Sequence, residues 1–199
     1  MAITKVTGAL LGNYTGGSAD DTVVVGDGAG DAITTGVDNT LIGDNAGTAL
    51  TEGSDNVAVG NEALAANTTG TKNTTVGKSA GAAITTGEKN VLIGYNSGKL
   101  TTIGIKNVAV GSYSLDANTE GENNVAIGQS ALGANTTADN NTGVGINSLT
   151  SNTTGTENVA VGKDALKVNT TGSYNTAVGG YGTLDANTTA NNNLSLIHI

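Results

Sequence analysis

The five-residue sequence NVAVG occurs at Asn56–Gly60, Asn107–Gly111 and Asn158–Gly162, and close variants of it stand between these copies. The glycine that closes each unit recurs every 17 residues without insertion, at positions 26, 43, 60, 77, 94, 111, 128, 145, 162 and 179. A fixed short period is the signature of architectures in which each repeat packs only on its neighbours. Short alternating strands bounded by Asn and Gly therefore predict an all-β parallel β-solenoid, a β-roll of about ten 17-residue coils.

The repeats act as an internal alignment, and we number its positions as columns 1 to 17 from the Asn. Column 2 is always Val or Thr, column 4 is always Val or Ile, and column 5 is always Gly. Alternate residues of a strand point to the same side. We therefore expect columns 2 and 4 to face the coil interior, with column 4 as a core ladder formed by Val59, Val76, Ile93, Val110, Ile127, Val144 and Val161.

Column 1 is Asn in nine of the ten coils. Stacked strands bring identical side chains together, and Asn amides can then hydrogen-bond from coil to coil. The sequence predicts such an Asn ladder, formed by Asn56, Asn73, Asn90, Asn107, Asn124, Asn141 and Asn158.

Two further column patterns indicate a folded chain with a packed core and a solvent-exposed corner, and not a disordered chain. Coils with Gly at column 9 mostly have Ile or Leu at column 12, whereas coils with Leu at column 9 have Asn there. Close packing demands that kind of volume conservation. Column 17 holds Lys72, Lys89 and Lys106 in successive coils, so it must be exposed to water, because stacked charges in a dry interior would be prohibitive.

Column 3 is small and apolar, although it should point away from columns 2 and 4. A strand that is apolar on both faces is usually buried on both, and exposed apolar stripes mark interfaces. We therefore expect column 3 to form an oligomer interface, at Ala58, Leu92, Ala109, Ala126, Ala160 and Ala177.

The segments NVAVGNEALA and NVAIGQSALG resemble the head repeats of trimeric autotransporter adhesins, and the longer Gly/Asn/Thr-rich unit resembles repeats of phage tail-fibre-like and bacterial surface proteins. The resemblance covers about residues 20–193. It implies a left-handed roll, assembled as a parallel homotrimer, with an adhesive or fibre role. Its implied partners are copies of the chain itself and a host-cell surface, glycan or matrix. It also implies an extracellular location, on a virion or a bacterial surface.

The two ends depart from the repeat. Residues 1–20 do not fit the frame and are expected to form an irregular cap or a degenerate coil, ahead of a repeat domain over 21–193. The tail at 194–199, LSLIHI, has a foreign composition and contains the one histidine, His198. It is interpreted as a non-repeat tail arising from a sequencing or truncation artefact, with a capping strand as the alternative. The first residues show no recognisable export signal.

Composition limits the function classes. The chain has a net charge of −9 and no Arg, so a nucleic-acid surface is not expected. It has no Cys and one His, and its carboxylates are scattered in turns, so we expect neither an enzyme nor a cofactor. No apolar stretch of the sequence is long enough to span a membrane.

Three motifs suggest other roles. The stretch GDGAGD at Gly26–Asp31 hints at calcium, but ordinary turn residues explain it, and no metal site is expected. The recurrent NTT matches the glycosylation sequon but favours hydrogen bonds to turn backbone. Tyr95, Tyr113 and Tyr181 lie at or beside columns 6 and 7 and are possible surface contacts.

These observations leave three functions open. The leading one is a non-enzymatic structural fibre or an adhesin-like surface protein. An ice- or surface-binding solenoid is the second, although columns 13 and 14 point to opposite sides and so provide no flat Thr face. A calcium-dependent adhesion module is the third.

Overall fold

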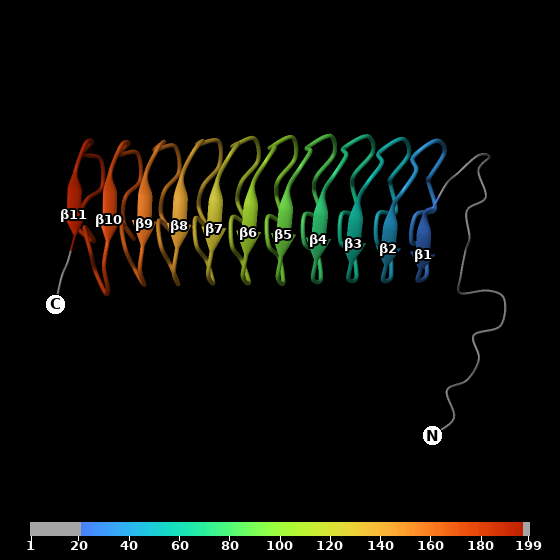
Figure 1. The fold of residues 1–199 in the computed structure, drawn as a ribbon, viewed down its shortest axis with the longest axis horizontal. Helices are drawn as coiled ribbons and strands as arrows, with labels where there is room; N and C mark the ends of the chain where they lie inside the picture. The colour runs from blue at the N-terminus through green and yellow to red at the C-terminus, as the bar shows by residue number, and fades with distance from the viewer. Residues whose placement is uncertain (1–20, 197–199) are drawn as a thin grey trace, which may run out of the picture.

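The structure is a computed structural model that describes residues 21–196 as one stack of coils, each carrying a single strand (Figure 1). No helix occurs within this range, so the expected all-β parallel solenoid of about ten turns is confirmed. The strands are β1 (Val23–Val25), β2 (Thr40–Ile42), β3 (Val57–Val59), β4 (Thr74–Val76), β5 (Val91–Ile93), β6 (Val108–Val110), β7 (Val125–Ile127), β8 (Thr142–Val144), β9 (Val159–Val161), β10 (Thr176–Val178) and β11 (Leu194–Leu196).

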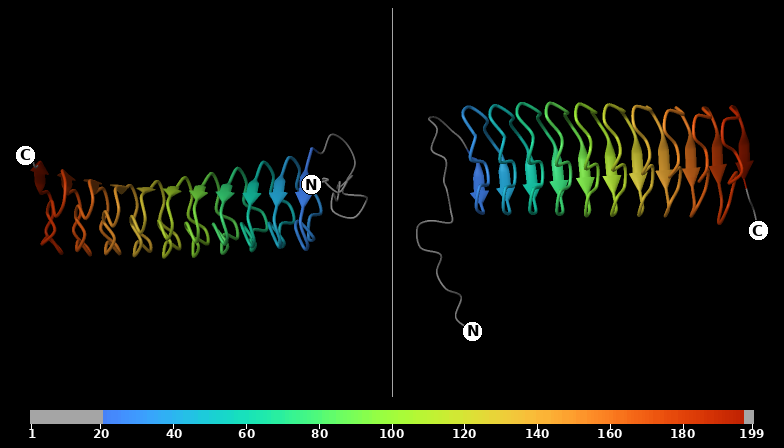
Figure 2. Two further views of the ribbon diagram at one scale, coloured as in Figure 1. Left: turned by 90° about the horizontal axis from the view of Figure 1, so that it is seen from below. Right: turned by 180° about the vertical axis from the view of Figure 1, so that it is seen from behind.

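The eleven strands form one parallel sheet in chain order, from β1 to β11. Each residue pairs with its equivalent in the next coil, as Ala109 does with Ala126. The sheet lies along one side of the stack, and the turns of every coil lie on the other side (Figure 2). A repeat of 17 residues therefore places each column in a straight row parallel to the stack axis.

The first three residues of the C-terminal tail continue the stack. Residues Leu194–Leu196, assigned to a non-repeat tail with a capping strand as the alternative, form β11 and pair in parallel with β10. Asn193 also continues the column-1 Asn row, since its backbone N–H donates to Asn175 Oδ1 at 3.0 Å. The extra residue Gly180 is absorbed in the turns of the preceding coil. The expected cap over 1–20 and the last three residues of the tail lie outside the described residues.

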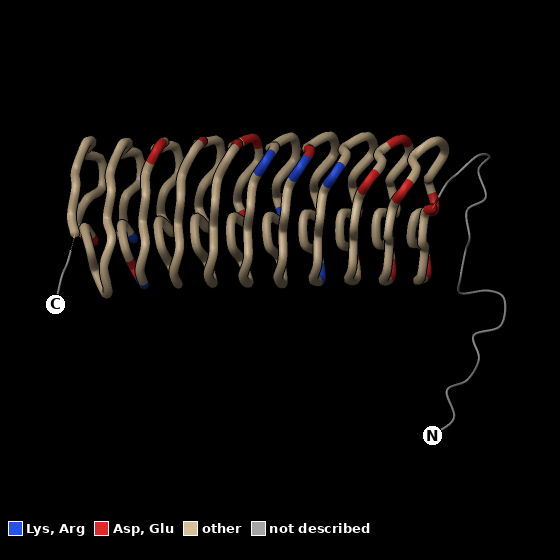
Figure 3. The backbone as a smooth tube through the Cα atoms, viewed as in Figure 1, with Lys and Arg blue, Asp and Glu red and all other residues tan. Residues whose placement is uncertain are grey.

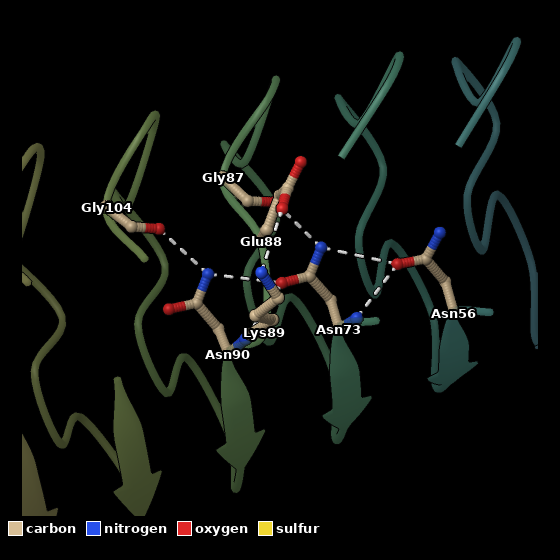
Figure 4. Close-up of polar contacts among 7 residues, drawn as sticks. All are labelled: Asn56, Asn73, Gly87, Glu88, Lys89, Asn90 and Gly104. Atoms are coloured by element: carbon tan, nitrogen blue, oxygen red, sulfur yellow. Dashed lines mark hydrogen bonds and ion pairs between the residues drawn. The ribbon is translucent and has the colours of Figure 1, made fainter. Parts of the chain in front are cut away.

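The predicted Asn ladder is present and fully buried (Figure 4). Asn73 illustrates its geometry: the backbone N–H and Nδ2 of Asn73 both donate to Asn56 Oδ1, at 3.0 and 3.3 Å. The same Nδ2 donates to the carbonyl of Gly87, at the column-15 corner of its own coil, at 2.8 Å. Each amide therefore joins two coils and closes its own coil, which accounts for the near invariance of column 1.

A second amide ladder runs through column 12 of the later coils. Asn135 Nδ2 donates to Asn118 Oδ1 at 3.0 Å, and the pattern continues through Asn152, Asn169 and Asn187. All of these except Asn118 are sequon-like NTT asparagines, and these four also donate to the column-15 carbonyl three residues on. The expected hydrogen bonding to turn backbone is confirmed, and the additional bonds from coil to coil were not predicted.

Threonine hydroxyls add a third row at column 13. Each Thr Oγ1 donates to the carbonyl oxygen of the equivalent Thr in the next coil, for example Thr102 to Thr119 at 2.9 Å. Together the three rows hold the coils in register around their circumference. Such a coil has little freedom to twist or slide relative to its neighbours, so the sheet presents its columns as regular, parallel rows.

The core lies inside the coils and is formed by columns 3, 8, 9 and 12. Columns 3 and 9 compensate each other in all ten coils: Val, Leu or Thr at column 3 accompanies Gly at column 9, and Ala or Gly at column 3 accompanies Leu. The structure shows why, because a Cβ added to Gly98 would come within 2.7 Å of Leu92 Cδ1. A thin coil holds only one large side chain at this level.

Candidate functional site: the outer face of the sheet

The outer face of the sheet is formed by columns 2 and 4, and the expected inside and outside faces of the strand are therefore exchanged. Ala109 at column 3 is fully buried, whereas Ile127 at column 4 is 40% exposed. Strand alternation showed that columns 2 and 4 share a side but not which side is the interior. The side-chain volumes at columns 3 and 9 vary inversely, so the two columns share one space. This identifies column 3 as the interior side of the strand.

Two predicted residue sets are thus corrected. The column-4 side chains are not core: Ile93 and Ile127 are exposed and the other five are half-buried, namely Val59, Val76, Val110, Val144 and Val161. The column-3 residues cannot form an oligomer interface, because they are fully buried within a single chain: Ala58, Leu92, Ala109, Ala126, Ala160 and Ala177. The alanines leave room for the column-9 leucine of their coil, and Leu92 fills the same space where column 9 is Gly98.

The outer face is regular and uncharged. Column 2 presents Val or Thr and column 4 presents Val or Ile in every coil from β1 to β10, so two rows of β-branched side chains run along the stack. None of the strands contains a charged residue (Figure 3). The row pair continues at β11, where Leu194 and Leu196 are 70% and 65% exposed. A continuous uncharged stripe therefore spans all eleven strands.

Charged side chains border this face without entering it. Column 17 is exposed in every coil, as expected, and holds acidic residues, then Lys72, Lys89 and Lys106, then uncharged residues and Glu157. Its residues adopt left-handed backbone conformations, such as φ 58° at Lys106. The side chains at this corner, two residues before each strand, are therefore in contact with water.

The three candidate tyrosines are exposed, but only two of them lie together. The rings of Tyr95 and Tyr113 meet edge to face, with centroids 5.3 Å apart and planes at 84°. A side-chain hydrogen bond with Tyr95 raises the pKa of Tyr113 above its ordinary value, an effect that the Asn96 side chain opposes. Tyr181 is 78% exposed, and Lys163 Nζ lies 5.2 Å from its ring centre.

Acidic residues do not converge on a metal site within residues 21–196, where no three carboxylate, His or Cys side chains gather as ligands. Asp27 and Asp31, in the stretch that hinted at calcium, are both exposed. Two other carboxyl groups have altered acidity. Burial raises the pKa of Asp116, and a hydrogen bond from Asn147 lowers the pKa of Asp164, helped by Lys167.

Among the described residues no helix is long and apolar enough to cross a membrane. Comparison with protein-family models, with curated proteins and with solved structures found no match to this chain.

Proposed function

We propose that this chain is a non-enzymatic structural fibre or adhesin-like surface protein whose copies associate through the outer face of the sheet. The observation that carries the proposal is the pair of uncharged β-branched rows, columns 2 and 4, which continue through all ten repeats. A solitary rod would gain solubility from polar residues on this face. The β-branched residues found there in all ten repeats support our proposal that another molecule covers this face.

The dimensions of the face support this role. Eleven strands about 4.8 Å apart give a stripe about 50 Å long, and two side-chain rows make it about 10 Å wide. The resulting ~500 Å² lies at the upper end of the largest apolar patch of a typical monomer. A standard interface buries about 800 Å² per partner. The stripe would therefore form the apolar centre of an interface, with the flanking corner columns as its polar rim.

The assembly that we propose is a parallel homotrimer of left-handed coils, exposed outside the cell on a virion or a bacterial surface. Three amide and hydroxyl rows that lock the coils in register suit a rod that bears load without changing shape. The composition, with no Cys, no Arg and one His, supports a non-enzymatic role. Host surface, glycan or matrix components are the proposed external partners.

Sedimentation velocity tests the proposal with a matched pair of variants. Val110→Lys with Ile127→Lys places two charges on the outer face, where both side chains are half-buried or exposed, so each chain should still fold. Asn123→Lys with Asn140→Lys adds the same charge at column 17, a position that already accepts Lys in three coils. The first variant should sediment as a monomer with an unchanged β circular-dichroism spectrum, and the second as the wild-type oligomer. A monomeric wild type at micromolar concentration would overturn the proposal.

A second candidate function, ice or surface binding, is favoured by the same geometry. It requires β-branched or Thr side chains at alternate positions on one flat outer face, and columns 2 and 4 provide this, with Thr40, Thr74, Thr142 and Thr176 in column 2. Thermal hysteresis of the purified protein separates the two functions. A monomer with hysteresis supports ice binding, whereas an oligomer without it supports the fibre.

A further inference from the structure

We propose that Tyr95 and Tyr113 form a shallow binding site for a sugar ring on the flank of the solenoid. The two residues come just after Gly94 and Gly111, so they lie at the corner beyond the strands and outside the β-branched rows. This inference gives the proposed surface fibre a ligand class, but its site is separate from the face through which copies would associate.

The rings are not explained by the needs of the fold. Tyr95 and Tyr113 are 44% and 40% exposed, and neither belongs to the core cluster. Tyr113 also adopts a left-handed backbone conformation, with φ 57°. Bulky side chains disfavour that region, and in other coils the same column holds short polar residues or Glu: Asn45, Glu62, Ser79, Asn96, Ser130, Asn147 and Asp164. An aromatic residue that strains its own turn and stays exposed points to a functional role.

Neutral, acidic and basic side chains all lie in the same two coils as the rings. Asn96, 8% exposed, holds the same column as Tyr113 in the preceding coil. Lys99 and Asp116 share column 10 of the same two coils, three residues beyond Asn96 and Tyr113. The site thus combines aromatic surface with hydroxyl, amide, carboxylate and ammonium groups. A sugar ring matches this combination, because its C–H face packs on an aromatic ring and its hydroxyls donate and accept hydrogen bonds at the edge.

Size also selects a small ligand. The two tyrosines belong to adjacent coils, which together span about 10 Å along the axis. A stable protein partner would need about 800 Å² from this chain, far more than two coils provide on one flank. A monosaccharide or one residue of a glycan chain fits within this length.

Tyrosine fluorescence offers a direct assay, since the chain has no Trp and only five Tyr. The probes are maltotriose, cellotriose, chitotriose and sialyllactose, each titrated into the full chain up to tens of millimolar. We expect at least one of them to bind. Tyr95→Ala should then raise the Kd about tenfold, the loss expected for one aromatic contact, whereas the control Tyr181→Ala should leave it unchanged.

Tyr113→Gly separates a binding role from a structural one. Glycine favours the left-handed conformation, so this variant should melt at the same or a higher temperature while its affinity falls. A lower melting temperature with unchanged affinity would assign Tyr113 to the fold and overturn the inference. Failure of the wild type to bind any of the four probes would also overturn it. Neither result affects sedimentation, which tests the proposed self-association independently.

Discussion

Replacing Asn107 with alanine should destabilise the solenoid strongly, because this side chain makes four hydrogen bonds in a fully buried position. Its Oδ1 accepts from the backbone N–H and Nδ2 of Asn124 at 3.0 and 3.2 Å. Its Nδ2 donates to Asn90 Oδ1 at 3.2 Å and to the Gly121 carbonyl at 2.8 Å. Asn107→Ala removes all four bonds without giving any of the partners access to solvent.

Three of the four partner groups keep another hydrogen bond. Asn90 Oδ1 still accepts from the backbone N–H of residue 107, and the Gly121 carbonyl still accepts from Asn118 Nδ2. Asn124 Nδ2 still donates to the Ala138 carbonyl. Only the backbone N–H of Asn124 loses its sole partner. An unsatisfied buried donor costs about 1–3 kcal/mol, and with the other lost bonds the total reaches about 2–4 kcal/mol.

A loss of that size lowers the melting temperature by about 5–15 °C in a chain of this length, measured by circular dichroism. The matched control is Asn61→Ala. The Asn61 side chain bonds only the carbonyl and carboxylate of Asp44 at the solvent-exposed corner, and surface changes of this kind stay within about 0.5 kcal/mol. Equal melting temperatures for the two variants would refute the claim that the Asn ladder stabilises the stack.

Three further predictions follow from individual positions. Ala109→Asp should abolish folding, because it places a carboxylate in a fully buried site at a cost of several kcal/mol. Val110→Asp, one residue on, should keep its β circular-dichroism spectrum and protease resistance. A folded Ala109→Asp with an unfolded Val110→Asp would mean that the inner and outer faces are assigned wrongly. Thr101→Val should raise the melting temperature by about 2–4 °C, since the buried Thr101 hydroxyl has no hydrogen-bond partner within the described residues. A melting temperature below that of the wild type would mean that the hydroxyl does have a hydrogen-bond partner. Asn147→Gly should raise the pKa of Asp164 toward its ordinary value of 3.8 in a carboxyl NMR titration, because it removes the main cause of the lowering. The lowered pKa stabilises the fold above pH 3.8, and this stabilisation is lost as the pH falls through the folded-state value. Asn147 has φ 56°, a conformation that glycine favours, so the variant gains some stability at every pH. Its stability relative to the wild type should therefore be lower near neutral pH than in strong acid; an unchanged pKa would assign the shift to Lys167.

The periodicity was sufficient to predict the stack, because a 17-residue repeat with one short strand allows few other arrangements. The ladder at column 1 and the exposure of column 17 also followed from the columns. Both depend on a single residue type whose chemistry permits only one environment: a stacked amide must be paired, and a stacked ammonium must be hydrated.

The two faces of the strand could not be assigned from alternation, because Val and Ala are both compatible with either side. Column 3 was interpreted as an interface since its residues are small. The small residues are in fact required by the narrow interior, where Leu115 or its equivalent already fills the space. The pairing of column 3 with column 9 was present in the sequence and would have placed column 3 inside.

The second Asn ladder was also missed, for a different reason. A sequon-like NTT at a turn accounts for hydrogen bonds within its own coil, and nothing in one repeat shows that the same amide reaches the next. Asn118 and Asn135 make both kinds of bond. The contiguous run of Asn at column 12 in the last five complete coils is the signal that indicates it.

The most direct test of the account is disulfide cross-linking between copies through a cysteine on the outer face. The chain contains no Cys, so Val110→Cys introduces a single thiol, in the middle strand of the eleven. A residue at the centre of the sheet faces its own equivalent whether neighbouring copies are parallel or antiparallel. Under mild oxidation at micromolar concentration, Val110→Cys should form covalent dimers, and the corner control Lys106→Cys should remain monomeric on a denaturing gel. Dimers from Lys106→Cys and none from Val110→Cys would contradict the assignment of the outer sheet face as the contact between copies.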